Sequence, residues 1–389
     1  MLIIGLMSGT SADGVDVVLV EITERDSKLH VDLKKSLFVP YSEEMREAIF
    51  QISNPDSVRL QEIVALNPII GELFGEAALS LCKVAGCDIN DVDAIGSHGQ
   101  TIWHQPVAIP IGGVAGRGTL QIGSAAVISA ITGQPVVSDF RSADMAVGGQ
   151  GAPLVPYADW KLFGHPVEDR LMLNIGGIAN VTWLPAGCTR DEIIAFDTGP
   201  GNMLIDLAAY RSTAGAQMMD VDGQLARRGK VIDEFVNILN DHEYFDRPLP
   251  KSTGREMFGE YYFRHAITGA ASNRGIKGKD FVATITAFTA RTIADAVRNY
   301  LPERASNCDL ICAGGGVLNP TLMMMLASEL PGATIKRTDE FGVPTEAWEA
   351  IAFAILSHAT LTGKPSNVPS ATGASRPVIL GSITNVNVA

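Results

Sequence analysis

Residues 5–16 read GLMSGTSADGVD, and this stretch sets the plan of the fold. The apolar runs around it, at 2–7 and 15–22, are typical of two strands. Between them, residues 8–14 form a turn rich in glycine and hydroxyl side chains. Glycine lets backbone N–H groups approach an anion closely, and a turn points several of them the same way. The stretch therefore predicts a strand, a turn suited to phosphate oxygens, and a second strand.

Two later turns resemble the first in composition. FDTGPGN at 196–202 and CAGGGVLNP at 312–320 both end apolar runs. One such turn is usually a plain hairpin, but three of them, two beside aspartates, favour a nucleotide site. A P-loop is absent, because TGKPS at 362–366 lacks the upstream glycine and has proline after its lysine. A dinucleotide pattern fails at Asn319, which takes the place of its third glycine and weakens an NAD site.

Outside this stretch, the two halves of the chain show the same order of predicted strands and helices. Each half begins with three strands that meet at Gly-rich turns and continues with helices and strands in alternation. Strands are predicted at 2–7, 15–22, 30–39, 92–99, 120–123, 134–140, 170–177, 178–185, 192–199 and 308–316. Helices are predicted at 124–132, 200–212, about 230–241, 260–271, 280–300, 320–330 and 344–360. This order predicts an α/β protein with two domains facing each other across a cleft.

We place the two domains at 1–140 and 141–389, with part of the C-terminal segment able to join the first. The 389 residues also leave room for a small third domain. A net charge of -13 repels phosphate backbones and argues against nucleic acid as the main partner. The N-terminus has no basic leader and no long apolar run follows, so we expect a cytoplasmic protein without a membrane partner.

Five cysteines are an odd number without a disulfide framework. Cys308 and Cys312 resemble half of a metal site, but no Cys or His pair with zinc spacing follows them. We therefore expect buried thiols in a reducing compartment.

Six motifs carry a resemblance to a known family. They are GLMSGTSADGVD (5–16), SHGQTIWHQP (97–106), GGQGAPLVP (148–156), NIGGIANVT (174–182), FDTGPGN (196–202) and AGGGVLNP (313–320). Their form and order resemble those of the anhydro-N-acetylmuramic acid kinases over nearly the whole chain. Residues 189–196 and the tail after 363 are less clearly family-like.

The resemblance implies the fold of the sugar kinase, Hsp70 and actin superfamily. This fold has two ribonuclease H-like α/β domains with mixed sheets facing a central cleft. The implied reaction uses ATP and Mg²⁺ to convert 1,6-anhydro-N-acetylmuramic acid into N-acetylmuramic acid 6-phosphate during peptidoglycan recycling. A homodimer is also a family-level expectation.

The chemistry of this reaction gives Asp197 a role. The anhydro bridge joins C1 to O6, so O6 becomes available only when water cleaves the C1–O6 bond. A base must take the proton of that water, and we predict that Asp197 is this base. The sharp turn would hold the carboxylate rigidly while the following N–H groups stay available for phosphate. The alternative is that Asp197 merely caps the helix that follows.

The resemblance also implies which residues bind the nucleotide. Residues 9–16 would wrap the β- and γ-phosphates, with Asp13 or Asp16 near Mg²⁺ through water. Residues 314–316 would approach the adenosine and α-phosphate, with a simple strand-to-helix turn as an equal alternative. The alternative for Asp13 is a turn residue before Gly14, which is a frequent use of aspartate. The nucleotide-binding candidates are Gly9, Thr10, Ser11, Ala12, Asp13, Gly14, Val15, Asp16, Gly176, Gly199, Gly201, Gly314, Gly315 and Gly316.

Polar side chains after an apolar strand suit recognition of sugar hydroxyls. His98, Gln100 and Thr101 form such a group. Glu349 resembles a family acid that reaches the sugar, and is otherwise one solvated helix charge. Arg141 is a candidate for the lactyl carboxylate of the sugar or for a surface ion pair.

His98 and His104 lie six residues apart, which could suggest a metal, but no third ligand is evident. For His104 we favour a structural histidine. Two other functions stay open. One is a conventional amino-sugar kinase of the same fold, and the other is an actin- or Hsp70-like protein that ATP switches between shapes. The SHGQT cluster at 97–101 argues against the second.

Overall fold

The computed structural model describes residues 1–25, 28–55 and 58–386 and divides the chain into two compact units. Unit 1 comprises Met1–Leu162 with Ala347–Ala389, and unit 2 comprises Phe163–Glu346. Unit 1 thus extends beyond the expected boundary at 140. A physical reason is the buried carboxylate of Asp144, which accepts hydrogen bonds from Asn367 Nδ2 at 2.8 Å and Thr372 Oγ1 at 2.7 Å. These bonds fasten the segment after residue 140 to the C-terminal tail.

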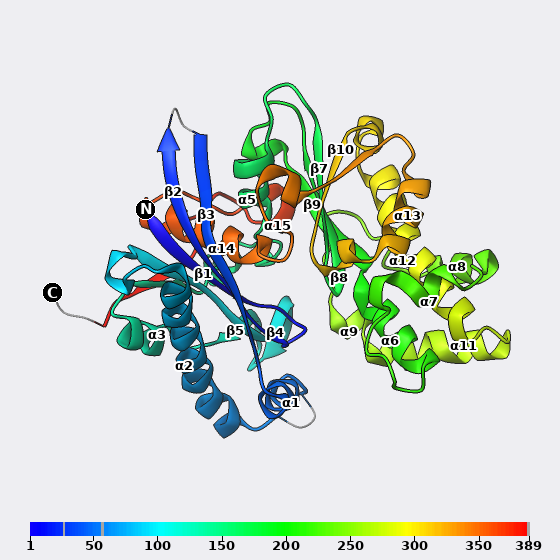
Figure 1. Ribbon diagram of the computed structural model, residues 1–389, viewed down its shortest axis with the longest axis horizontal. Helices are drawn as coiled ribbons and strands as arrows, with labels where there is room; N and C mark the ends of the chain where they lie inside the picture. Colours follow the sequence, from blue (N-terminus) through cyan, green and yellow to red (C-terminus); the bar gives the residue numbers. More distant parts are fainter. Residues whose placement is uncertain (26–27, 56–57, 387–389) are drawn as a thin grey trace. The chain divides into compact units, whose positions relative to one another are not determined.

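Unit 1 contains a mixed sheet with helices on both faces (Figure 1). Its strands are β1 (Leu2–Ser8), β2 (Gly14–Arg25), β3 (Lys28–Pro40), β4 (Ala94–Ile111), β5 (Val114–Ile122), β6 (Val136–Ser138) and β12 (Ser382–Thr384). Its helices are α1 (Glu43–Ile52), α2 (Leu60–Ala85), α3 (Ala125–Thr132), α4 (Ser142–Ala146), α5 (Pro156–Phe163, which ends at the unit boundary), α14 (Trp348–Leu361) and α15 (Pro369–Thr372). The strand order is β12-β6-β4-β1-β2-β3, and β5 pairs with β4.

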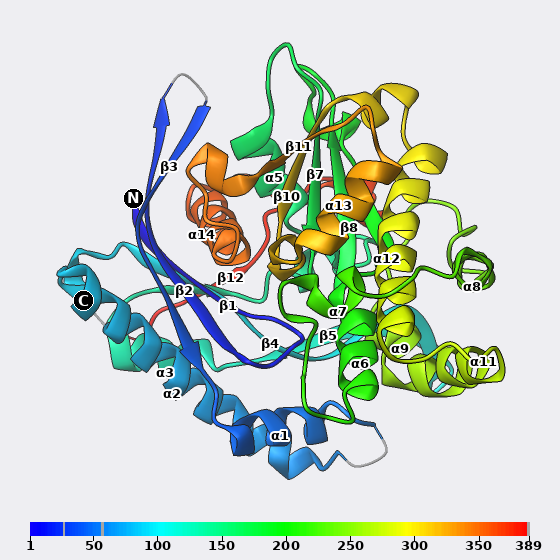
Figure 2. The ribbon, with the colours of Figure 1, turned by 45° about the vertical axis from the view of Figure 1, so that its right-hand side comes forward.

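Helices α2 and α3 cover one face of this sheet and α14 covers the other (Figure 2). On the α14 side, Gly5 of β1 pairs with Gly96 of β4. A Cβ atom on Gly5 would lie 2.1 Å from the Ala350 carbonyl oxygen, and one on Gly96 would lie 2.0 Å from Ser357 Oγ. The paired glycines therefore let α14 lie directly on the strands.

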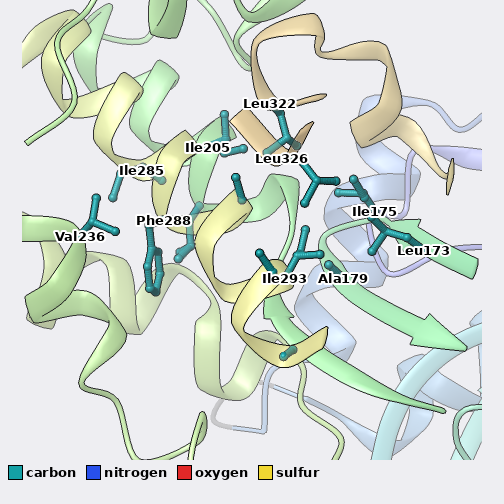
Figure 3. Close-up of a cluster of buried hydrophobic side chains, with 14 of the residues drawn as sticks. Leu173, Ile175, Ala179, Ile205, Val236, Ile285, Phe288, Ile293, Leu322 and Leu326 are labelled. Carbon is teal, nitrogen blue, oxygen red and sulfur yellow. The ribbon is translucent and has the colours of Figure 1, made fainter. Parts of the chain in front are cut away.

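Unit 2 is built around a second mixed sheet. Its strands are β7 (Arg170–Ile175), β8 (Ile178–Leu184), β9 (Ile194–Pro200), β10 (Asp309–Ala313) and β11 (Thr334–Arg337), in the order β11-β10-β7-β8-β9. Its helices are α6 (Asn202–Ser212), α7 (Gln224–Arg227), α8 (Asp233–Asn240), α9 (Arg255–Phe258), α10 (Glu260–Tyr262), α11 (Thr268–Asn273), α12 (Gly278–Tyr300) and α13 (Pro320–Glu329). Figure 3 shows its core, where Ile175 of β7 lies among side chains of α12 and α13 such as Ile293 and Leu326.

The two sheets share one topology. In unit 1 the first three strands are antiparallel neighbours, and β4 and β6 then extend the sheet in parallel from β1. In unit 2, β7, β8 and β9 repeat the antiparallel part, and β10 and β11 extend it in parallel from β7. The expected duplication of a ribonuclease H-like mixed sheet is confirmed.

Several predicted elements need correction. The sequence argument omitted α1 and α2 altogether. The strands predicted at 92–99 and 120–123 are parts of β4 and β5, which form a much longer hairpin. Its tight turn is formed by Gly112 and Gly113, which take positive φ values of 59° and 83°. The helix predicted at 260–271 consists of α10, a π-helical segment at Phe263–Ile267, and α11.

The last predicted helix, at 344–360, begins at Trp348. Thr345 Oγ1 donates to Asp339 Oδ2 at 2.5 Å, and this bond holds the residues before α14 in a turn.

Within the described part of the chain, α2 is the one helix long and apolar enough to cross a membrane by length and composition alone. It packs against the sheet and α3, and Ile70, Phe74 and Leu81 are buried in the core of unit 1. This packing is that of a core helix.

Candidate active site

Asp197 lies on β9 in unit 2 with a half-buried side chain. Its N–H donates to the Lys251 carbonyl at 3.3 Å, and its own carbonyl accepts from the Tyr244 hydroxyl at 2.7 Å. The backbone N–H of Thr253 donates to Asp197 Oδ2 at 2.9 Å. One segment, residues 244–253, therefore fixes both the backbone and the carboxylate of Asp197.

The helix-capping alternative for Asp197 is wrong. The residue at the N-cap of α6 is Gly201, and it receives no side-chain capping bond. Asp197 instead belongs to the strand, where it pairs with Asn180 of β8 just after a register shift. Its carboxylate faces the Thr253 N–H and not the N–H groups of the helix.

Three Gly-rich loops of unit 2 meet at one end of the sheet. The N–H of Asn202 donates to the Gly176 carbonyl at 2.8 Å, and a Cβ atom on Gly201 would lie 2.2 Å from that oxygen. A Cβ atom on Gly315 would lie 3.7 Å from Asn202 Nδ2. The turn between β7 and β8, the start of α6 and the end of β10 are therefore adjacent and closely packed, with Gly201 buried and Gly315 exposed.

The other glycines predicted here are held by their neighbours. Gly314 has φ 83°, and a Cβ atom on it would lie 2.4 Å from Asn174 Oδ1. At Gly199, φ is 141° and a Cβ atom would meet the Phe245 ring at 2.8 Å. Gly316 packs on Ile175. Side chains at these positions would push the loops apart.

In unit 1, the turn between β1 and β2 is braced by one buried side chain. Gln100 Oε1 lies 2.6 Å from Ser8 Oγ, and Gln100 Nε2 donates to the Gly9 carbonyl at 3.1 Å. Ser8 Oγ is also 2.8 Å from the Gly14 carbonyl, and Ala12 takes a positive φ of 49°. Gln100, predicted to contact sugar, thus has its amide engaged with the predicted phosphate turn.

The remaining residues of this turn differ in exposure. Thr10, Ser11 and Asp13 are exposed, whereas Ala12, Gly14 and Val15 are buried. Val15 can therefore reach a nucleotide only through its backbone.

Asp13 and Asp16 are the acidic residues of the turn and of the start of β2. Ser11 Oγ donates to Asp13 Oδ1 at 2.7 Å, and Asp16 is half-exposed opposite Met7. Within residues 1–25, 28–55 and 58–386, no three or more His, Cys, Asp or Glu side chains cluster as a metal site. Two carboxylates still fit Mg²⁺, which keeps several waters and takes further ligands from substrate phosphates.

His98 and Arg141 lie side by side in unit 1. Arg141 Nη2 is 2.8 Å from His98 Nε2, and His98 Nδ1 is 2.9 Å from the Gly99 carbonyl. A guanidinium only donates, so Nε2 accepts and Nδ1 carries the proton. Burial, with a further contribution from Arg141, lowers the pKa of His98 well below its ordinary value. His98 is therefore neutral, and Phe353 packs on its ring at a centroid distance of 4.5 Å.

Three other predicted residues lie in the same unit. His104 Nδ1 is 3.1 Å from Thr119 Oγ1 across the hairpin, and burial together with Arg141 lowers its pKa to about 4. Thr101 Oγ1 accepts from Gln121 Nε2 at 3.2 Å. Glu349 is half-buried in the first turn of α14.

The cysteine pair of unit 2 is protonated. Burial raises the pKa of Cys312 to about 12, and burial with a smaller effect of Asp169 does the same for Cys308. Both cysteines are free, Cys312 buried and Cys308 half-buried.

Sequence reasoning missed residues 244–253 as part of the site. The segment ends in PKST at 250–253, a turn-like stretch of lysine and hydroxyl residues that Gly254 follows. No spacing rule connects it with Asp197, more than forty residues earlier. Only the folded structure shows that this segment bonds to the Asp197 backbone through Tyr244 and Lys251 and to its carboxylate through Thr253.

Comparison with known proteins agrees with the geometry. The family described as anhydro-N-acetylmuramic acid kinase matches residues 1–386. The chain is 45% identical to the protein of that name from Caldanaerobacter subterraneus subsp. tengcongensis, over 98% of this chain and 96% of the relative. It is 41% identical to those from Salinibacter ruber, over 98% and 96%, and Bacillus cereus, over 99% and 99%.

Proposed function

The chain belongs to the anhydro-N-acetylmuramic acid kinase family, and on that premise we propose that it uses ATP to open and phosphorylate 1,6-anhydro-N-acetylmuramic acid. The products are N-acetylmuramic acid 6-phosphate and ADP, and the reaction serves peptidoglycan recycling in the cytoplasm. The observation that carries the proposal is Asp197, fixed on β9 through three hydrogen bonds within a full-length family match.

In this reaction Asp197 takes the proton of the attacking water. The water oxygen bonds to C1, the electron pair of the C1–O6 bond moves to O6, and O6 bonds to the γ-phosphorus as ADP leaves. The bond from the Thr253 N–H holds one carboxylate oxygen and so sets the plane of the base. Correct orientation of a general base in this way lowers the barrier.

The phosphates are proposed to contact the turn at residues 9–16 and the glycines of unit 2. Supporting this, the three loops of unit 2 lie next to one another with Gly315 exposed, and the turn of unit 1 is braced by Gln100. Asp13 and Asp16 would hold Mg²⁺ through water, and the ion would neutralise charge on the phosphates. The first N–H groups of α6 do not add to this site, contrary to the expectation from the sequence, because those of Gly201, Asn202 and Met203 donate to the carbonyls of Gly176 and Gly177.

The sugar is proposed to contact His98, Gln100, Thr101 and Glu349. Both ring nitrogens of His98 already have partners, so His98 contributes chiefly by ordering Arg141. The Arg141 guanidinium also donates to the Gly151 carbonyl at 2.7 Å. An arginine held on two sides suits the lactyl carboxylate of the sugar. We also propose a homodimer, which light scattering of the pure protein would test.

The test is mass spectrometry of the product formed from ATP, Mg²⁺ and the anhydro sugar, with Asp197→Asn run in parallel. We expect a product heavier than the sugar by one phosphoryl group and one water. In water labelled with heavy oxygen, the label should sit at C1 and not in the phosphate.

The Asp197→Asn variant keeps an oxygen that can accept from Thr253, so it should fold. Its kcat should fall by about 10²- to 10⁴-fold because the general base is gone. A kcat within tenfold of the native value would remove Asp197 from the role of base. Addition of phosphate without water would indicate a conventional sugar kinase, and ATP hydrolysis independent of sugar would indicate an ATP-switched protein.

A further inference from the structure

The segment that holds Asp197 is itself anchored by a buried lysine. Lys251 is 5% exposed, and its Nζ donates to the Phe245 carbonyl at 3.1 Å. The same Nζ lies 3.8 Å from the ring centroid of Tyr300 and 5.1 Å from that of Tyr244. It therefore occupies a cage of aromatic faces, where a cation is attracted by each ring.

The cage and the bonds to Asp197 share residues. Tyr244 forms one wall of the cage and donates its hydroxyl to the Asp197 carbonyl. A second wall is Phe196, the chain neighbour of Asp197, at 5.7 Å from Nζ. The Lys251 carbonyl accepts from the Asp197 N–H, and Thr253 donates to the carboxylate two residues later.

We propose that Lys251 is a positioning residue for the base. Its ammonium, held among Tyr300, Tyr244 and Phe196, fixes the segment at 244–253 and thereby the orientation of the Asp197 carboxylate. This inference rests on the proposed function, because it assigns Lys251 an effect only through Asp197.

The charge of Lys251 is not neutralised by a close partner. Within the described residues no carboxylate forms a salt bridge with its Nζ. The small cavity beside it is lined by Asp246 from its own segment and by Asp295 and Tyr300 from α12. From β9 come only the uncharged Phe196 and Thr198. The aromatic rings are therefore the principal contacts of the ammonium.

Burial lowers the pKa of Lys251 to about 8, against a smaller opposing effect of Asp246. The side chain is charged below that pH and neutral above it. As pH rises through about 8, the attraction between the ammonium and the rings is lost. Because the pKa of Lys251 is lower in the folded protein than in the unfolded chain, the unfolded chain binds more protons above about pH 8. The free energy of unfolding therefore does not fall when the folded protein loses this proton. Activity and folding stability should therefore respond differently to pH.

The experiment compares Lys251→Met and Lys251→Arg with the native enzyme, with Lys230→Met as the control at an exposed lysine of the same unit. Lys251→Met fills the cage without charge and should lower kcat by about 10- to 100-fold, with the KM values for both substrates changed by less than about threefold. Lys230→Met should behave as native. An unchanged kcat in a folded Lys251→Met enzyme would overturn the proposal.

The pH profile keeps the proposal testable should Lys251→Met fail to fold. Native kcat should decline as pH rises through about 8. Because a guanidinium stays charged, Lys251→Arg should retain activity and lose this decline. Identical profiles for the two proteins would overturn the proposal.

A double variant separates this inference from the proposed function. Added to Asp197→Asn, Lys251→Met should cause no further loss of the residual kcat, since Lys251 acts through the carboxylate. A further tenfold loss would refute a role through Asp197. If Asp197→Asn itself stayed active, the base assignment would fail, whereas an inactive Asp197→Asn beside a native-like Lys251→Met would reject only the role of Lys251.

Discussion

The turn at residues 8–14 and the turn after Asp197 are both rich in glycine, but different kinds of contact hold them. The first turn is bridged from the neighbouring strand β4 by the Gln100 side chain, and the Tyr41 hydroxyl adds a bond to Ser8. The second depends on a whole segment, residues 244–253, which bonds to Asp197 mainly through its backbone. The difference matters because a side-chain brace can be removed by one substitution, whereas a backbone brace must be loosened through its anchor.

Together with the proposed function, this contrast predicts different tasks for the two turns. The first offers exposed hydroxyl groups and backbone at positions 9–11, so its brace should govern nucleotide affinity. The second presents one carboxylate in a fixed plane, so its brace should govern the chemical step. Substitutions in the two braces should therefore alter different kinetic constants.

The largest effect on the first turn should come from Gln100→Met, which keeps the size of the side chain and removes both bonds. The Ser8 hydroxyl would keep the Gly14 carbonyl and the Gly9 carbonyl would keep the Ala12 N–H, so the free energy of unfolding should fall by only about 1 kcal/mol. The KM for ATP should rise by roughly tenfold, because a loosened turn must be ordered on binding. Denaturant unfolding and steady-state kinetics measure the two effects.

The matched control is Gln121→Met, on the neighbouring strand β5, whose amide donates to Thr101 and Thr119 away from the turn. It should leave the KM for ATP within about twofold of native. A large fall in kcat with native KM in Gln100→Met would contradict the division of tasks between the braces.

A smaller effect is expected for Tyr244→Phe, which removes one hydroxyl from the second brace. The ring stays in the cage around Lys251, but the Asp197 carbonyl loses its donor. The loss should be about 1 kcal/mol of stability, and kcat should fall several-fold with little change in the KM for ATP. Tyr210→Phe, at a half-exposed tyrosine of α6, serves as the control. An altered KM for ATP with native kcat would show that this segment serves binding instead.

Much of the fold could be predicted from local patterns. The three-strand openings follow from apolar runs and Gly-rich turns, and both halves repeat them. The long helix α2 was not predicted because its many apolar residues obscure the helical periodicity of about 3.6 residues and because it contains Pro68. The hairpin of β4 and β5 was shortened because its outer residues, such as Val107 and Ile111, are exposed and do not alternate with polar ones.

The candidate site divides in the same way. Asp197 became a candidate base only through the family resemblance, because its turn alone is more typical of a helix cap. Gln100 also stood in a motif, but its bonds to Ser8 and Gly9 depend on the pairing of β1 with β4. Lys251 and its cage could not be predicted, because Phe196, Tyr244 and Tyr300 come together only in the folded unit.

The smallest effect is expected for the KM for ATP, which should stay constant with pH while kcat changes. This difference in pH dependence distinguishes the two braces. The first brace consists of hydroxyl, amide and carbonyl groups, and burial raises the pKa of Tyr41, which donates to Ser8. None of these groups should titrate between about pH 7.5 and 9.5, so the KM for ATP should stay within about twofold. Over the same interval Lys251 loses its proton and kcat should decline. Steady-state kinetics at saturating sugar across this interval measure both constants, and a KM that rises while kcat stays level would reverse the assignment of the two braces.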